Sequence, residues 1–250
     1  LLHRLAPQCS RYVGTDVSAA VLEHLRRNVP DNVTLLLREA DDFTDIEPGG
    51  FDVVVLSSVV QYFPALEYLE QVGWRPDVII GSSVGAVNAA ALGSGISVRG
   101  LKSRWMDLKT KDVQKMRADD VLFDNVLFRR DHIIDLWPWP ETLAGKRSTW
   151  KGRPWFRPEV INSRSAPYEV HVTAVSTKTT EVEFFTNRDP GGLTLEHIVA
   201  SFSIPLWYGP SEINGEPYWD GGTLANTPFR RALEIEPGNG PAEVLGPVEV

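Results

Sequence analysis

Ser83 stands in a short pattern that could make its hydroxyl a nucleophile. The pattern is Gly81-x-Ser83-x-Gly85, and it lies between an apolar stretch at residues 78–80 and a stretch of small residues at 86–91. The apolar stretch has the length and branching of a buried strand, and the small residues favour a helix. A sharp turn between strand and helix lifts a serine hydroxyl clear of the backbone. We expect both glycines to prevent Cβ collisions in that turn.

The helix predicted after Ser83 would also stabilise negative charge. Its N-terminal N–H groups and the positive end of its dipole would point to the place where an oxyanion forms during acyl transfer. The N–H of Val84, directly after the serine, is the expected donor. The pattern alone is weak evidence, because roughly one chain in ten of this length carries it by chance. An ordinary strand–loop–helix junction is therefore the alternative.

Asp220 is the second candidate for chemistry. An Asn-Gly turn signal within residues 214–219 predicts a hairpin whose second strand ends at Asp220. A carboxylate within reach of Ser83 could accept the proton of its hydroxyl. Gly221 and Gly222 would let the backbone fold tightly enough for this approach. Taken alone, Asp-Gly-Gly is typical of a turn without chemistry.

Motifs that follow one another along the chain resemble those of patatin-like phospholipases. They are GSSVGA at residues 81–86, ASFSIP at 200–205, YWDGG at 218–222 and NTP at 226–228. The resemblance covers about residues 73–236 and is specific, because order and spacing match as well as composition. It implies a lipid acyl hydrolase in which Ser83 is the nucleophile and Asp220 the base, a dyad that needs no histidine. It also implies a lipid or small acyl-ester substrate and no cofactor.

The same resemblance reveals a gap in the expected oxyanion hole. Family members place a glycine-rich loop with a cation, followed by a helix, before the nucleophile strand. The corresponding loop here, residues 57–64, contains neither a glycine nor a cation. We expect Val84 N–H, with groups of Ser57 and Ser58, to take its place, and losing one well-aimed donor typically costs about 10²- to 10³-fold in rate. An impaired hydrolase and a catalytically inactive fusion or scaffold protein both remain open.

Residues 1–72 carry a different set of motifs. YVGTDVS at residues 12–18, EADDF at 39–43 and FDVVVLSSVVQYFP at 51–64 resemble the middle of class I S-adenosylmethionine-dependent methyltransferases, especially those embedded in nonribosomal peptide synthetases. The resemblance implies that Asp16 binds ribose hydroxyls and that Asp41 contacts adenine, at the carboxyl ends of strands.

The methyltransferase-like segment is truncated on both sides. The glycine-rich loop that receives the cofactor should precede residue 1, and the rest of such a domain should follow residue 72, but the sequence has neither. We therefore expect no bound methyl donor and interpret Asp16 and Asp41 as solvated acids at strand ends. A remnant methyltransferase is the alternative.

Strands that alternate with helices predict the fold class. Residues 11–15, 33–37 and 51–56 are expected as strands, with a helix at 19–28 capped by Ser18. The pattern predicts an α/β fold with a mainly parallel sheet in a three-layer α/β/α sandwich, patatin-like with a Rossmann-like N-terminal extension. The expected segments are the methyltransferase-like residues 1–72, the hydrolase-like residues 73–236, and an irregular tail at 237–250 that is rich in proline and glycine.

Composition narrows the classes of function. A net charge of -8 without a long basic run argues against a nucleic-acid partner. The single cysteine, Cys9, fits a reducing compartment, so we expect a cytoplasmic protein. No apolar run has the length of a membrane span, and no signal peptide is expected. Leu1 is not a methionine, so the sequence can be a fragment whose true N-terminus is unseen.

Tryptophans gather in one less regular region, at Trp137, Trp139, Trp150 and Trp155. Amphipathic tryptophans near a lipase site can sit at a lipid interface, which would give peripheral membrane contact. The alternative is that they pack over the sheet as a cap. The second interpretation is favoured, because no basic amphipathic helix accompanies them.

Overall fold

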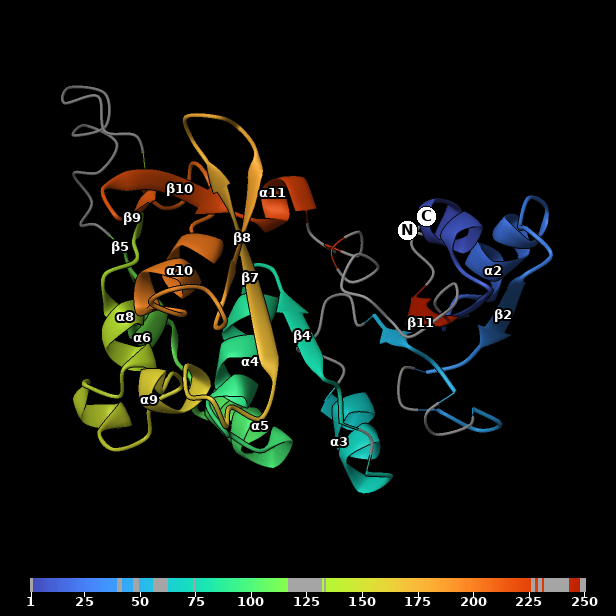
Figure 1. Cartoon of the computed structure of the whole chain (residues 1–250), viewed down its shortest axis with the longest axis horizontal. Helices are drawn as coiled ribbons and strands as arrows, with labels where there is room; N and C mark the ends of the chain where they lie inside the picture. The colour runs from blue at the N-terminus through green and yellow to red at the C-terminus, as the bar shows by residue number, and fades with distance from the viewer. Residues whose placement is uncertain are drawn as a thin grey trace. The chain divides into compact units, whose positions relative to one another are not determined.

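The chain forms two compact units, each with its own sheet (Figure 1). Unit 1 comprises residues 1–75 and 229–250, and unit 2 comprises residues 76–228. This division differs from the three expected segments, because the C-terminal residues belong to the same unit as the N-terminal ones. The computed structural model describes residues 2–39, 42–46, 50–55, 63–73, 75–116, 132, 134–225, 228, 231 and 243–247.

Unit 1 is built on a parallel sheet with the strand order β2-β1-β11-β3. Its strands are β1 (Arg11–Asp16), β2 (Val33–Leu37), β3 (Val53–Val54) and β11 (Glu243–Pro247). β11 pairs with β1 along one edge and with β3 along the other. The expectation of an irregular C-terminal tail was therefore wrong. Proline and glycine dominate residues 237–241, ahead of the strand, whereas five extended residues suffice to join β1 and β3.

The helices of unit 1 pack by their apolar residues. α2 (Ala19–Arg26) begins after Ser18, whose hydroxyl accepts a hydrogen bond from the Val21 N–H, as the sequence predicted. Its buried Leu22 and Leu25 belong to one core cluster with residues of β1 and of the N-terminal α1 (Leu2–Leu5), which the sequence did not predict. The remaining helical segments are η1 (Ala6–Gln8) and α3 (Phe63–Gln71).

The sheet of unit 2 is mixed rather than mainly parallel. Its strands are β4 (Val78–Gly81), β7 (Glu169–Ser176), β8 (Val182–Thr186), β9 (Ser211–Ile213) and β10 (Glu216–Asp220). Only the β4–β7 pair is parallel among these strands. The other pairs are antiparallel, namely the hairpins β7–β8 and β9–β10 and the pair β7–β10. In the β9–β10 hairpin Asn214 and Gly215 adopt φ values of 52° and 79°, as a type I′ turn requires.

Two strands of unit 2 end facing each other along one edge of β7. β8 covers the other edge, from His171 to Val175. On the shared edge β4 ends at Gly81, opposite Val172, and β10 runs the opposite way and ends at Asp220, opposite Ala174. The C-terminal ends of β4 and β10 are thus brought to the same place in the sheet, although they are far apart in sequence.

Helices pack on this sheet, which confirms the α/β class. α4 (Val84–Gly93) is buried almost throughout, and a Cβ added at Gly93 would lie 2.6 Å from Val170 Cγ2 of β7, so helix and strand are in close contact. α10 (Leu195–Ser201) packs against β7, β9, β10 and α4. The other described elements are α5 (Val98–Asp107), α6 (Thr110–Val113), α8 (Pro138–Leu143), η3 (Ser148–Trp150), α9 (Pro158–Ile161), α11 (Gly222–Ala225), β5 (Lys115–Met116) and β6 (Ile134–Asp135).

The tryptophan-rich region is part of the core of unit 2. Trp139, Trp150 and Trp155 are each at most 1% exposed, and the rings of Trp139 and Trp155 lie 5.7 Å apart. Packing as a cap is therefore the correct interpretation for these three, and the lipid interface is wrong for them, whereas Trp137 is exposed. None of the helices in the described part of the chain is long and apolar enough to cross a membrane.

Candidate active site

Ser83 lies on a strained turn between β4 and α4. Its φ of 54° and ψ of -125° are uncommon for a residue with a Cβ atom. Gly81 makes the turn feasible, because a Cβ there would lie 2.6 Å from Ala86 N and closer still to the Gly85 carbonyl. Gly85 differs from the expectation, since a Cβ there would meet nothing within 4 Å. Only the first glycine of the pattern is therefore sterically required.

The structure brings Ser83 and Asp220 together. Ser83 Oγ donates a hydrogen bond to Asp220 Oδ2 at 2.6 Å. The distance lies within the range over which a carboxylate can accept a hydroxyl proton directly. Ser83 is half-buried, whereas Asp220 is 3% exposed. The pair therefore has a partly exposed serine and a sheltered carboxylate.

Asp220 is held by its backbone as well as by Ser83. The Gly222 N–H donates to Asp220 Oδ1 at 2.6 Å, and the Asp220 N–H donates to the Ser203 carbonyl at 2.8 Å. Burial raises the pKa of Asp220 above its ordinary 3.8, and the hydrogen bonds from Ser83 and Gly222 oppose that rise. A raised pKa makes the carboxylate a stronger base than an exposed aspartate.

Thr173, on β7, touches both halves of this arrangement. Its Oγ1 donates to Ser82 Oγ at 2.8 Å, directly beside the turn that carries Ser83. A Cβ added at Gly221 would lie 2.5 Å from the Thr173 carbonyl oxygen and closer still to its hydroxyl. Gly221 is therefore required for the close approach of the Asp220 segment to β7, as the sequence predicted.

Ser201 and Ser203 are site residues that sequence reasoning missed. Ser201 Oγ accepts a hydrogen bond from the Ser83 N–H at 3.1 Å, and Ser203 provides the carbonyl that accepts from Asp220. Both serines are fully buried. The ASFSIP motif at residues 200–205 contains them, but it served only to support the family resemblance. Serines on the buried side of an apolar helix were the signal that could have identified them.

One expected oxyanion donor is described. Val84 is the first residue of α4, and the next two N–H groups, of Gly85 and Ala86, donate to the carbonyls of Ser82 and Ser83. The N–H of Val84 follows Ser83 directly, and its role as an oxyanion donor stays a prediction. The other two expected donors, Ser57 and Ser58, lie outside the described residues.

The histidines of unit 2 have structural partners. His171 Nε2 lies 2.7 Å from Glu169 Oε1, and His197 Nδ1 accepts from the Thr194 N–H at 3.0 Å. Burial lowers the pKa of His197. His197 therefore acts as a neutral cap of α10 near physiological pH.

The structure describes one of the two acids that the methyltransferase resemblance assigns to a cofactor. Asp16 Oδ1 accepts a hydrogen bond from the Ser18 N–H at 2.7 Å, and Asp41 lies outside the described residues. A hollow of about 590 Å³ lies beside the ends of β1 and β2, and Val17, Leu37, Arg38, Glu39 and Asp42 line it. The described residues around it include no glycine-rich turn that leads into a helix. A loop of that form receives the cofactor in such domains.

Comparison with known proteins agrees with the geometry of unit 2. The sequence model of the patatin-like phospholipases matches residues 57–233, well over half of the chain. The chain belongs to the patatin-like phospholipase family. This is a family of lipid hydrolases, and the motifs around Ser83 and Asp220 lie inside the matched region. A methyltransferase domain model matches residues 1–73.

The relatives found by sequence are large synthetases. Chondramide synthase cmdD of Chondromyces crocatus is 49% identical over 77 residues, which are 29% of this chain and 2% of that protein. The probable non-canonical nonribosomal peptide synthetase CymA of Salinispora arenicola is 37% identical over 76 residues, 29% of this chain and 1% of that protein. The chain thus spans a small part of the length of these relatives. Among solved structures, VipD from Legionella pneumophila has a TM-score of 0.48 at 15% identity, over 78% of this chain and 48% of that one.

Proposed function

We propose that this chain is a serine acyl hydrolase of lipid esters that uses Ser83 as its nucleophile and Asp220 as its base. The observation that carries the proposal is the 2.6 Å hydrogen bond between the Ser83 hydroxyl and the Asp220 carboxylate. A serine on a tight turn at the end of a strand and a buried base beside it are what covalent acyl transfer requires. Membership of the patatin-like phospholipase family supports a lipid ester as substrate.

The reaction would run in two stages, acylation of Ser83 and hydrolysis of the acyl-serine, and Asp220 accepts and returns one proton in each. Asp220 accepts the Ser83 proton while Oγ attacks the ester carbonyl carbon, and the carbonyl electrons move to the oxygen. The oxyanion collapses, the bond to the alcohol breaks, and Asp220 returns the proton to the departing alkoxide. Water then attacks the acyl-serine with Asp220 as its base, which releases the carboxylic acid and restores the hydroxyl. The N–H of Val84 would donate to the oxyanion.

Ester hydrolysis by the full chain tests the proposal. We expect turnover of p-nitrophenyl butyrate that Ser83→Ala and Asp220→Asn each reduce by about 10³-fold or more. A fluorophosphonate probe should label Ser83 and leave the neighbouring Ser82 unlabelled, as read by mass spectrometry of peptides. Equal hydrolysis by wild type and Ser83→Ala would reject the nucleophile. A chain with no turnover and no label would be the inactive fusion or scaffold protein instead.

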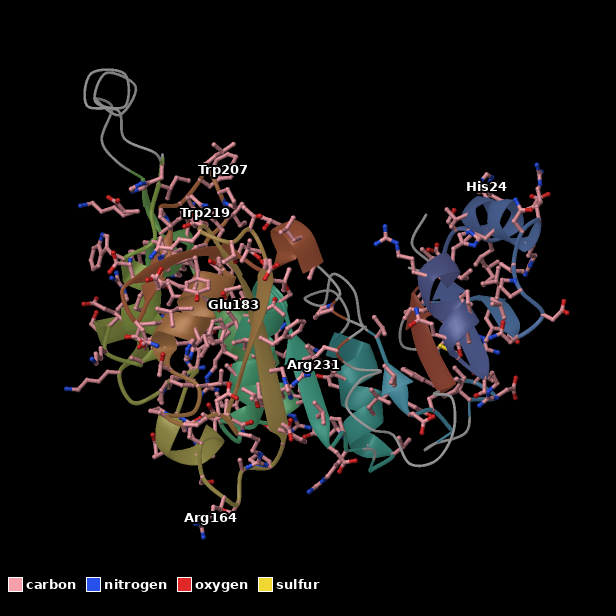
Figure 2. All side chains as sticks on the ribbon, turned by 45° about the horizontal axis from the view of Figure 1, so that its top comes forward. His24, Arg164, Glu183, Trp207, Trp219 and Arg231 are labelled. Carbon is pink, nitrogen blue, oxygen red and sulfur yellow. The ribbon has the colours of Figure 1, made fainter. Side chains whose placement is uncertain are left out.

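We propose further that the substrate is presented by a neutral lipid surface. Leu206, Trp207 and Leu224 are 75%, 56% and 61% exposed, respectively. Two of them follow the Ser201–Ser203 turn and the third lies on α11, directly after Asp220. Figure 2 shows the Trp207 side chain standing out from unit 2. Residues 201–210 and 221–225 contain no lysine or arginine, so the surface suits zwitterionic rather than anionic lipid.

Vesicle binding tests this surface with a matched control. Leu206→Ser combined with Trp207→Ser should lower sedimentation with phosphatidylcholine vesicles by about tenfold. The reason is that the double variant removes both apolar side chains that would insert into the lipid. Met106→Ser on α5 is the control, since Met106 is 81% exposed but lies far along the chain from the site. Equal binding by both variants, or binding only to anionic vesicles, would reject the proposed surface.

A further inference from the structure

The C-terminal end of α10 and the two residues after it contact both members of the Ser83–Asp220 pair. Ser201 Oγ accepts from the Ser83 N–H at 3.1 Å, and the Ser203 carbonyl accepts from the Asp220 N–H at 2.8 Å. Ser83 and Asp220 are 137 residues apart in sequence. Their two partners are separated by a single residue. One short segment therefore ties the backbone of the nucleophile to the backbone of the base.

We propose that Ser201 is a positioning residue and that the Ser201–Ser203 turn fixes the separation of nucleophile and base. This inference rests on the proposed function. The Ser201 hydroxyl contacts the pair through the Ser83 N–H, so it acts on the reaction through the backbone of the turn. Its role differs from that of Asp220, which takes the proton.

A hydrogen bond to the Ser83 N–H acts on a residue whose backbone conformation is unfavourable. The backbone of Ser83 has a φ of 54°, a conformation that persists only where the surroundings enforce it. Ser201 is 0% exposed, so water cannot readily replace its hydroxyl as the acceptor. Without this acceptor the turn can relax toward an ordinary conformation. Ser83 Oγ would then move from its place 2.6 Å from Asp220.

The turn is itself anchored, which a positioning element requires. Ser203 Oγ donates to the Val199 carbonyl at 2.8 Å and lies 2.7 Å from Ser211 Oγ of β9. The ring of Phe202, between the two serines, lies 5.6 Å from the ring of the buried Trp139. The turn is thus fixed by the helix, by a strand and by the tryptophan cap. A turn fixed in this way can hold both members of the pair in position.

A matched pair of serine variants separates positioning from stability. Ser94, at the other end of α4, is also 0% exposed, and its hydroxyl accepts from the Arg157 N–H at 2.9 Å. Ser201→Ala and Ser94→Ala should therefore lower the thermal midpoint by similar amounts. We expect only Ser201→Ala to lower kcat for the p-nitrophenyl ester, by about 10- to 100-fold with KM changed less than about twofold.

Amide hydrogen exchange gives a readout that needs no catalysis. The Ser83 amide should exchange about tenfold faster or more in Ser201→Ala, and at the wild-type rate in Ser94→Ala. Unchanged exchange, unchanged kcat in Ser201→Ala, or equal loss of kcat in both variants would each overturn the positioning role. A wild-type chain without esterase activity would instead overturn the proposed function together with this inference, so the two failures are distinguishable.

Discussion

Asp220 is buried, so its negative charge lowers the free energy of unfolding. Burial raises its pKa, so the folded chain holds the proton more tightly than the unfolded chain does. The free energy of unfolding therefore falls as pH rises from the ordinary pKa of an aspartate to the raised one, and the whole cost is present above that window. A carboxylate whose charged form reduces stability, beside a half-buried serine, is typical of a functional site.

The same shift predicts the pH dependence of ester hydrolysis. Asp220 must be ionised to accept the Ser83 proton, so kcat/KM should fall tenfold per pH unit below its pKa. Because burial raises that pKa, we expect the midpoint of the acid limb above 3.8. Initial rates with p-nitrophenyl butyrate across acidic pH, with circular dichroism to show that the chain stays folded, measure it. A midpoint at or below 3.8 in folded protein would contradict the assignment of Asp220 as the base.

At the scale of elements, the sequence predicted the local turns of unit 2 well but not the pairing of its distant segments. The Asn214-Gly215 hairpin and the strand–turn–helix around Ser83 follow from turn chemistry and periodicity, which act over a few residues. The contact of α10 with that turn joins residues 118 apart, and no local pattern encodes it. The antiparallel share of the sheet was missed for a related reason, since alternating helices and strands say little about how distant strands pair.

The two glycines beside Ser83 should differ in their effect on stability. Gly81→Ala places a Cβ 2.6 Å from Ala86 N, and we expect it to lower the free energy of unfolding by about 1–3 kcal/mol through overpacking. Gly85→Ala meets nothing within 4 Å and lies in the first turn of a helix, so its stability should stay within about 1 kcal/mol of wild type. Urea unfolding of both variants makes the comparison. Equal losses of unfolding free energy in the two variants would contradict the conclusion that only Gly81 is sterically required.

At the scale of the whole molecule, β11 joins the two ends of the chain in one unit. The strand lies between β1 and β3, so the N-terminal sheet is continuous only when residues near the C-terminus occupy its middle. Unit 2 is then an insertion within unit 1. The sequence did not predict this arrangement, because five residues by themselves carry little strand signal, and parallel pairing between distant segments leaves no local trace.

Removing β11 should therefore unfold unit 1 alone. Deletion of residues 243–250 leaves β1 and β3 without a common neighbour, whereas deletion of residues 248–250 leaves the strand whole and serves as the control. Seven of the eight tryptophans lie in residues 76–228, so tryptophan fluorescence reports on unit 2 and should keep its thermal transition. Far-UV circular dichroism should lose a transition only in the longer deletion.

Ester hydrolysis in that deletion then decides which residues complete the site. Ser83, Asp220, Thr173 and the Ser201–Ser203 turn all belong to unit 2, so the groups that hold the pair survive the loss of β11. We expect kcat within about threefold of wild type, because those groups supply the base, the nucleophile and the Val84 donor. A drop of about 10²-fold with an unchanged fluorescence transition would instead show that residues 57–62, which precede unit 2, contribute oxyanion donors.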